Sequence, residues 1–211
     1  MTTPPRIVLH HHPFTRAASV VWQLEEVGAP YTLKFHDVGK GEHKNAELLA
    51  LNPMGKLPVL QDGEAVIAET AAIGLYLADR YASGRLAPAL DDPARGTYLR
   101  WALFPAAVIE PAAMAHAAGW EYRVGSAGWG RYEDVLASVE HALSPGPWIL
   151  GERFTMADVI LGSTLRYMLM FKMLEPRPVF LDYVERLGER PANQRAQEIN
   201  QAVIAERGLG G

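Results

Sequence analysis

A chain of 211 residues, 49% of them hydrophobic and 21% charged, is long enough to bury a sizeable core in one or two domains. Its 20 Lys and Arg against 24 Asp and Glu give a formal charge of -4 without a run of like charge, so neither a nucleic-acid nor a membrane partner is indicated. The absence of cysteine excludes disulfides, thiolate metal sites and a catalytic cysteine, so any thiol chemistry must use a thiol of the ligand.

No segment of the sequence predicts export or a membrane anchor. Near the N-terminus only Ile7-Val8-Leu9 is apolar, which is too short for the apolar part of a secretory signal. Other apolar stretches are interrupted by Arg166, Glu110 or a proline before they reach the length that spans a bilayer. We therefore expect a cytoplasmic protein.

The first part of the chain predicts a β-α-β unit. Ile7-Val8-Leu9 form the centre of a short strand, and apolar residues between Arg16 and Val27 recur at helical spacing until Gly28. The stretch from Tyr31 to Phe35 then alternates as a second strand. Because a helical crossover joins the two strands, they should run parallel.

The stretch Asn52-Pro53-Met54-Gly55-Lys56-Leu57-Pro58-Val59-Leu60 organises the next part. It delivers Leu57-Pro58 into a short strand that turns back at Asp62-Gly63 into a second one, 65–67. Leu57-Pro58 is a candidate cis peptide, because an unusual isomer at the entrance of a strand is a feature that binding sites use. Glu69-Thr70 then opens a helix to Tyr81 whose free N–H groups and dipole favour an anion.

These elements predict two domains. With a short helix at 46–51, the order β-α-β-α-β-β-α gives a four-stranded mixed sheet with helices on its faces, a thioredoxin-like arrangement over residues 1–83. A linker follows at 84–92, within a stretch from Ser83 to Pro93 that holds a glycine, two prolines and two aspartates, and 93–211 shows only helical periodicity. Pro105 and Pro111 should interrupt its first helix. Thr155 and Asp158 should form a capping box that starts the central helix, a structural role.

The motif Asn52–Leu60 followed by Glu69-Thr70 resembles the glutathione-binding half of the cytosolic glutathione transferases, and the resemblance extends to both ends of the chain. It implies a thioredoxin-like domain in which the backbone of Leu57, before a cis Pro58, holds the cysteinyl part of glutathione. It also implies that Glu69 and Thr70 hold the γ-glutamyl part, and that the protein is a homodimer. Without the resemblance, Glu69 and Thr70 would be an ordinary helix start with an acid in its first turn.

In this family the loop after the first strand carries a Tyr, Ser or Cys that touches the glutathione sulfur. Here the window holds Phe14-Thr15-Arg16-Ala17, and none of the three residue types is present. Thr15 is the first choice, because its hydroxyl could donate to the thiolate, although it could equally be a plain helix cap. Arg16 could lend charge, and backbone amides could carry more of the stabilisation than is usual in the family.

Further residues complete the expected site. Lys56 is placed to pair with the glycyl carboxylate, and Lys44 or His43 could assist or could be solvated surface residues. Arg166 interrupts an apolar helix, so it is either half of a salt bridge, for which Glu110 is a candidate, or a cation aimed at the thiolate or the electrophile.

Two remaining groups of residues have mainly structural interpretations. His10-His11-His12 invite a metal site, but adjacent strand residues point to opposite faces, so we expect no metal there and place only His12 near the ligand. Apolar side chains that could either contact a second substrate or belong to the core are Trp101, Met114, Trp120, Met168 and Phe171.

The expected function is a detoxifying glutathione transferase that joins the thiolate of glutathione, its co-substrate, to a small apolar electrophile. Catalysis would come from a lowered thiol pKa and from proximity. A glutathione-dependent peroxidase, isomerase or dehalogenase would use the same site. The non-enzymatic alternative is a glutathione-binding protein that has kept the fold and lost turnover, which the missing Tyr, Ser or Cys keeps open.

Overall fold

The computed structural model describes residues 6–209, which divide into two compact units. The first unit contains the chain up to Ala82 together with the segment from Arg190 onward, and the second contains Ser83–Glu189. Residues 1–5 of the expected first domain and 210–211 of the expected second lie outside the described residues.

The first unit contains the expected four-stranded mixed sheet, in the order β2-β1-β3-β4. β1 (Ile7–His11) pairs parallel with β2 (Tyr31–Phe35) and antiparallel with β3 (Val59–Asp62), which pairs antiparallel with β4 (Ala65–Ala68). The fold predicted from the sequence is therefore confirmed for this unit, including the parallel β-α-β crossover.

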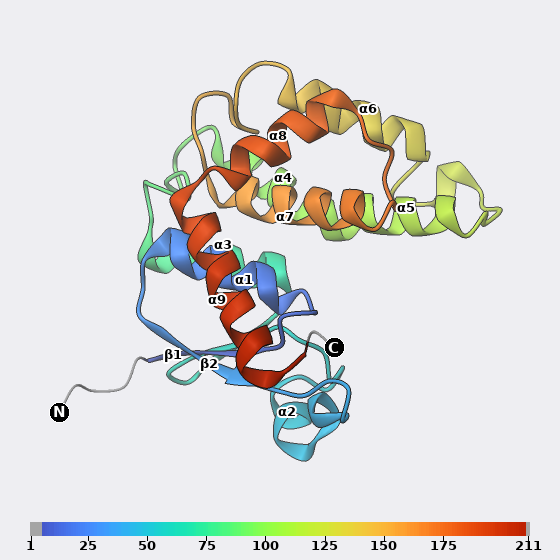
Figure 1. Cartoon of the computed structure of the whole chain (residues 1–211). Helices are drawn as coiled ribbons and strands as arrows, with labels where there is room; N and C mark the ends of the chain where they lie inside the picture. Colours follow the sequence, from blue (N-terminus) through green and yellow to red (C-terminus); the bar gives the residue numbers. More distant parts are fainter. Residues whose placement is uncertain (1–5, 210–211) are drawn as a thin grey trace. The chain divides into compact units, whose positions relative to one another are not determined.

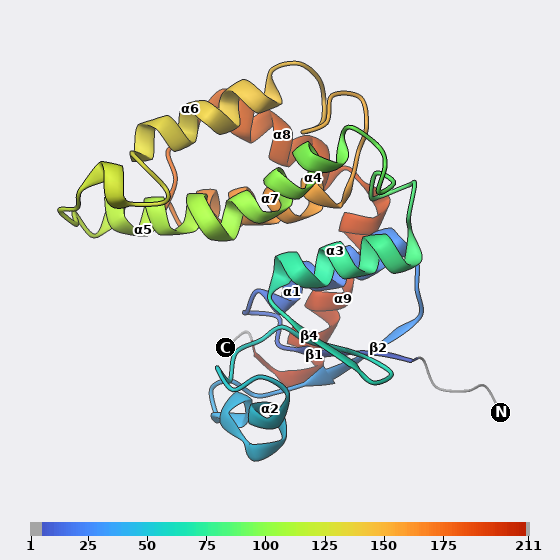
Figure 2. The same cartoon turned by 180° about the vertical axis from the view of Figure 1, so that it is seen from behind.

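Helices cover both faces of this sheet (Figures 1 and 2). α1 (Ala17–Val27) and α3 (Thr70–Tyr81) lie on one face and α2 (Ala46–Leu51) on the other. α1 ends at Gly28, whose φ of 72° lies in the left-handed region that glycine adopts without strain. The apolar periodicity of α1 is thus explained, because its inward side chains are almost fully buried.

A buried carboxylate ties α3 to the sheet. Asp62, at the end of β3, accepts hydrogen bonds from the hydroxyls of Tyr76 (2.8 Å) and Tyr81 (2.6 Å) and pairs with Arg6 (2.6 Å) and Arg80 (3.0 Å). Burial alone would raise the pKa of Asp62, but the two tyrosines and the two arginines hold it below its usual value. Asp62 therefore stays ionised and fixes the helix whose first residues are the expected γ-glutamyl site.

The C-terminal helix α9 (Pro191–Arg207) packs on α1 within the first unit. Arg190 binds the buried carboxylate of Glu26 through two nitrogens, at 2.6 and 2.8 Å, and Arg195 pairs with Glu25 at 2.9 Å. The sequence-based range of 93–211 for the helical domain thus differs from the compact unit at its C-terminal end. The reason is that helical periodicity reveals an apolar face but not the neighbour against which it packs.

Among the described residues of the second unit all named regular elements are helices, as its sequence predicts. Pro105 begins a π-helical turn, Pro105–Ile109, between α4 (Arg95–Phe104) and α5 (Glu110–Ala117), so the first long helix is interrupted there as expected. Pro111 lies in the first turn of α5 and does not interrupt it. Tyr183 and Phe180 are fully buried and belong to the core of the unit. Its α-helices are α4 (Arg95–Phe104), α5 (Glu110–Ala117), α6 (Tyr132–Leu143), α7 (Met156–Met170) and α8 (Pro178–Gly188).

The predicted capping box at Thr155 is present at the start of α7. The carboxylate of Asp158 accepts hydrogen bonds from the backbone N–H of Thr155 (2.8 Å), the backbone N–H of Ile149 (2.7 Å) and the hydroxyl of Tyr183 (2.9 Å). Burial raises the pKa of Asp158 to about 6, against the lowering effect of these hydrogen bonds. Asp158 therefore joins three segments of the helical unit, in agreement with the structural role expected for it.

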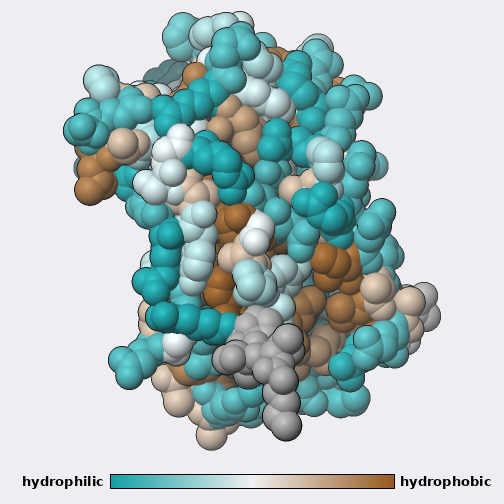
Figure 3. Space-filling view, turned by 90° about the vertical axis from the view of Figure 1, so that its left-hand side faces the viewer, coloured by the Kyte–Doolittle hydropathy of each residue, from teal (hydrophilic) through white to brown (hydrophobic). Residues whose placement is uncertain are grey.

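The surface in the view of Figure 3 is mostly hydrophilic, with hydrophobic residues in separate patches. No helix within residues 6–209 is long and apolar enough to cross a membrane.

Candidate functional site

The loop before β3 has the backbone geometry that the sequence predicts. The Leu57-Pro58 peptide bond is cis, and pairing of β3 begins only at Val59. The side chain of Asn52 holds the loop from inside, since its Nδ2 donates to the carbonyl of Lys56 (3.0 Å) and its Oδ1 accepts from the amide of Met54 (3.2 Å). The backbone of Leu57 therefore lies outside the ladder of the sheet, in a fixed loop.

The loop after β1 gives Thr15 a capping role. Its hydroxyl donates to the carbonyl of His12 (2.8 Å) and accepts from the amide of Ala17 (3.2 Å), so it satisfies one of the free amides at the start of α1. Arg16 follows at the N-cap position with an exposed side chain, and Phe14 is 61% exposed with its ring edge against His12.

A small apolar cluster brings these two loops together. Ala17, the first residue of α1, is fully buried in one cluster with Leu57, Leu48 and Val59. The N-terminus of α1 and the residue before the cis proline consequently share one core. A ligand whose backbone pairs with Leu57 would thus have its side chain next to the positive end of the α1 dipole.

Glu69 and Thr70 lie where β4 ends and α3 begins. Glu69 is the N-cap residue with φ 69° and ψ 125°, a conformation that costs a residue other than glycine about 1–3 kcal/mol. Its exposed side chain makes no capping hydrogen bond to α3. The strained backbone presents an acid and the first amides of a helix at one place, a suitable pair for the ammonium and carboxylate groups of an amino acid.

Two lysines flank the cis-proline loop before β3. Lys44 donates from Nζ to the carbonyl of Met54 (2.7 Å) and lies against Gly55, whose φ of 56° and lack of a Cβ leave room for it. Lys56 is exposed beside the cis peptide, and His43, half-buried, precedes Lys44. The structure therefore places both expected lysines next to the cis-proline loop.

The three consecutive histidines have different hydrogen-bond partners. His10 shares a 2.8 Å hydrogen bond with His36 and one with Gln61, whereas His11 contacts Asn200 at 2.8 Å. His12 accepts from the amide of Phe14 (3.2 Å) in the loop of Thr15. Within residues 6–209 no group of three His, Cys, Asp or Glu side chains could hold a metal ion.

Burial keeps these histidines neutral. It lowers the pKa of His11 to about 4, and it also lowers the pKa values of His10, His12 and His36. His12, in the loop of Thr15, is therefore neutral at neutral pH.

The second-substrate residues divide into two groups. Trp101 (3% exposed) and Met168 (1%) belong to the core of the helical unit, whereas Met114 (47%), Trp120 (61%) and Phe171 (58%) are exposed. Arg166, half-buried on α7, is in the same unit. Only the exposed three can contact a ligand without rearrangement.

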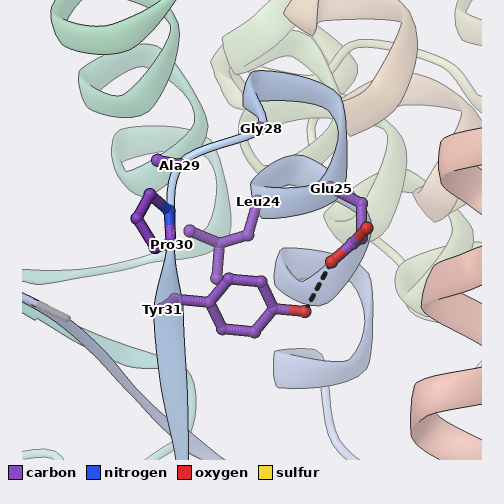
Figure 4. A pocket seen from close by; sticks show the side chains of 6 residues that line it. All are labelled: Leu24, Glu25, Gly28, Ala29, Pro30 and Tyr31. Atoms are coloured by element: carbon purple, nitrogen blue, oxygen red, sulfur yellow. Dashed lines mark hydrogen bonds between the residues drawn. The ribbon is translucent and has the colours of Figure 1, made fainter. Parts of the chain in front are cut away.

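A hollow at the opposite end of α1 is a different place (Figure 4). It is lined by Leu24, Glu25, Gly28, Ala29, Pro30 and Tyr31, and the hydroxyl of Tyr31 donates to Glu25 at 2.8 Å. None of the residues expected to bind glutathione contributes to it.

Sequence reasoning assigned no role to the side chains of Asn52 and Gln23. Asn52 could have been found, because Asn-Pro pairs initiate turns and asparagine side chains bond the backbone two residues on. Gln23, whose amide nitrogen donates to the carbonyl of Thr70 (3.1 Å), carries no such signal, since its partner is 47 residues away.

Comparison with known proteins identifies the family. Residues 5–79 match the family described as glutathione S-transferase, N-terminal domain, and residues 112–186 match glutathione S-transferase, C-terminal domain. The chain is 30% identical over 189 residues to glutathione S-transferase GstA of Escherichia coli, covering 87% of this chain and 90% of that protein.

Solved structures are similar over nearly the whole chain. A glutathione transferase of Phanerochaete chrysosporium in complex with oxidized glutathione is 28% identical, with a TM-score of 0.77 and coverage of 94% of this chain and 98% of that one. A theta class enzyme of Xanthomonas axonopodis pv. citri with glutathione bound is 29% identical, with a TM-score of 0.71 and coverage of 91% and 97%. With its two matched domains and its thioredoxin-like sheet, this chain belongs to the glutathione S-transferase family and is a glutathione transferase.

Proposed function

We propose that this protein binds glutathione on its thioredoxin-like unit and transfers the thiolate to a small apolar electrophile. The observation that carries the proposal is the cluster of Ala17 and Leu57, which holds the N-terminus of α1 beside the cis-proline loop. The glutathione and oxidized glutathione bound by the similar structures support it.

Each part of glutathione has a matching group on the protein. The backbone of Leu57, held by the cis Pro58, would pair with the cysteinyl residue, and Glu69 and Thr70 would bind the γ-glutamyl ammonium and carboxylate. Lys44 and Lys56 would face the glycyl carboxylate. The tripeptide would then lie extended from α3 to the lysines.

Activation of the thiol is the step that the protein must supply. A free thiol has a pKa of about 8.5, and lowering it by about two units takes roughly 2.7 kcal/mol of preferential thiolate stabilisation. The dipole of α1 would supply part of this, and the exposed side chain of Phe14 would contact the bound tripeptide. Thr15 would add a donor by turning its proton from the His12 carbonyl to the sulfur, and Arg16 would add positive charge.

The remaining features of the proposal follow the family. The electrophile would bind to exposed apolar side chains of the helical unit, with Arg166 stabilising the charge that develops on it. We propose a cytoplasmic homodimer in which 84–92 links the domains, with detoxification as its role. The chemistry uses glutathione as co-substrate and no metal.

Ultraviolet difference absorbance of bound glutathione across pH tests the proposal, with Thr15→Ala and Thr15→Ser beside the parent. A thiolate band well below pH 8.5 that weakens in Thr15→Ala and persists in Thr15→Ser supports activation by the Thr15 hydroxyl. A band unchanged in Thr15→Ala assigns the stabilisation to the backbone of α1. If bound glutathione shows no thiolate band, the transferase mechanism is refuted.

A second function, glutathione binding without catalysis, is favoured by the hydrogen bond from the Thr15 hydroxyl to the carbonyl of His12. While this bond is made, the hydroxyl cannot donate its proton to a thiolate. In that case the protein would bind glutathione without turnover. An electrophile panel decides between the two, and the same panel with peroxide, isomerisable and halogenated substrates covers the other reactions of this site. Glutathione binding without turnover of any of them would favour the binding protein.

A further inference from the structure

Gln23 is a polar residue at a buried position of α1, where an apolar side chain would have no hydrogen bonds to lose. It lies in the middle of α1 among Val20, Leu24 and Val27, and its side chain is completely buried. Burial of a primary amide is unfavourable unless its hydrogen bonds are replaced.

Only one of the two polar atoms of the Gln23 amide has a hydrogen-bond partner among the described residues. Nε2 donates to the carbonyl oxygen of Thr70 at 3.1 Å, and because a carbonyl can only accept, the orientation of the amide is fixed. Oε1 is buried and has no hydrogen-bond partner within residues 6–209. A half-satisfied buried amide adds little to stability, so its presence needs another explanation.

The hydrogen bond of the Gln23 side chain goes to the expected γ-glutamyl site. Thr70 is the first residue of α3 and follows Glu69, whose backbone is strained. Six residues earlier on the same helix, about 9 Å along its axis, Ala17 belongs to the same buried apolar cluster as Leu57 of the cis-proline loop. α1 is therefore in contact with both parts of the site, through Ala17 at its N-terminus and through Gln23 in its middle.

We propose that Gln23 is a positioning residue that holds the Glu69–Thr70 turn at a fixed distance from the thiol-binding end of α1. The proposal rests on the proposed function, since it assumes that Glu69 and Thr70 bind the γ-glutamyl group. Gln23 does not touch glutathione. Its hydrogen bond keeps the strained turn in the conformation in which the acid and the helix amides face one ligand.

Calorimetric titration of two ligands tests this role. Glutathione needs both parts of the site, whereas cysteinylglycine lacks the γ-glutamyl group. In Gln23→Leu we expect the Kd of glutathione to rise about five- to tenfold, the loss of one well-placed hydrogen bond, with the Kd of cysteinylglycine unchanged. Thermal denaturation should show a Tm equal to that of the parent or higher, because the variant removes a buried unpaired oxygen.

Two further variants make the result decisive. Gln23→Met keeps the length of the side chain without the donor and should behave like Gln23→Leu. Tyr31→Phe is the matched control, because it removes a different hydrogen bond to α1, the one to Glu25, at the end away from Thr70. It should leave both Kd values unchanged.

The ratio of the two dissociation constants decides the outcome. If Gln23→Leu and Gln23→Met leave it unchanged, or weaken both ligands equally, Gln23 does not position the γ-glutamyl site. A parent protein that binds neither ligand would instead refute the proposed function, and the two failures are thereby distinguishable.

Discussion

Replacement of Glu69 by glycine and by alanine separates two roles of one residue. Both variants lose the carboxylate, but only glycine adopts the observed φ of 69° without strain. The two should therefore bind glutathione equally weakly and differ in stability.

The magnitudes follow from the geometry of Glu69. The strain, which Glu69→Gly relieves, amounts to about 1–3 kcal/mol. The greater conformational freedom of glycine in the unfolded chain destabilises the folded Glu69→Gly variant by about 0.5–1 kcal/mol. Glu69→Gly should consequently be about 1 kcal/mol more stable than Glu69→Ala, or about 2–4 °C in Tm for a chain of this size. Loss of a charge-assisted hydrogen bond to the γ-glutamyl ammonium, about 1.5–3 kcal/mol, should raise the Kd of glutathione by at least about tenfold in both.

Thermal denaturation and calorimetric titration of the same samples give both quantities. Glu64→Ala, which removes an exposed acid from the turn between β3 and β4, is the control and should change neither. A glycine variant less stable than the alanine variant would show that the backbone at Glu69 is not strained. An unchanged Kd in both would show that its carboxylate does not contact glutathione.

Three further predictions concern other parts of the molecule. Burial lowers the pKa of His11 to about 4, against about 6.5 in the unfolded chain, so the unfolded state binds a proton at a higher pH than the folded state. The contribution of His11 to the free energy of unfolding should therefore be complete above pH 6.5 and fall by up to about 3 kcal/mol as the pH drops to 4. Urea unfolding should show this loss reduced in His11→Gln, and an identical pH profile would assign it to other groups. Asp158→Ala leaves the amide of Thr155 and two other buried donors unpaired and should cost at least about 3 kcal/mol in urea unfolding, whereas a loss below about 1 kcal/mol would contradict the hydrogen bonds described. Arg166→Leu should lower kcat at least about tenfold with little change in the Kd of glutathione, and full turnover would remove Arg166 from the mechanism.

The parts of the fold that could be predicted are those whose signal lies within a few residues. The cis bond at Leu57-Pro58, the capping box from Thr155 and the interruption at Pro105 all depend on local covalent or hydrogen-bonding geometry, and all three are confirmed. The β-α-β order was equally accessible, because periodicity changes from two to 3.6 along the chain.

What the sequence could not provide are contacts between distant segments and unusual dihedral angles. Nothing local indicates that Glu69 has a positive φ, since glutamate rarely does. The hydrogen bond that Thr15 donates to the carbonyl of His12, which engages the proton of its hydroxyl, depends on how the loop turns. The pairing of Arg190 with Glu26 spans 164 residues, and each alone has the appearance of a surface charge.

The packing of α9 on α1 has a consequence for synthesis on the ribosome. The thioredoxin-like unit needs residues from 190 onward, so it cannot be completed when its own strands have emerged. At about 5–20 residues per second, translation of the helical unit imposes a delay of about 5–20 s. During that interval Glu26, which ends up buried, has to remain hydrated, because Arg190 has not yet been made. Throughout this stage of synthesis the side of α1 that α9 covers in the finished chain has no helix to pack against.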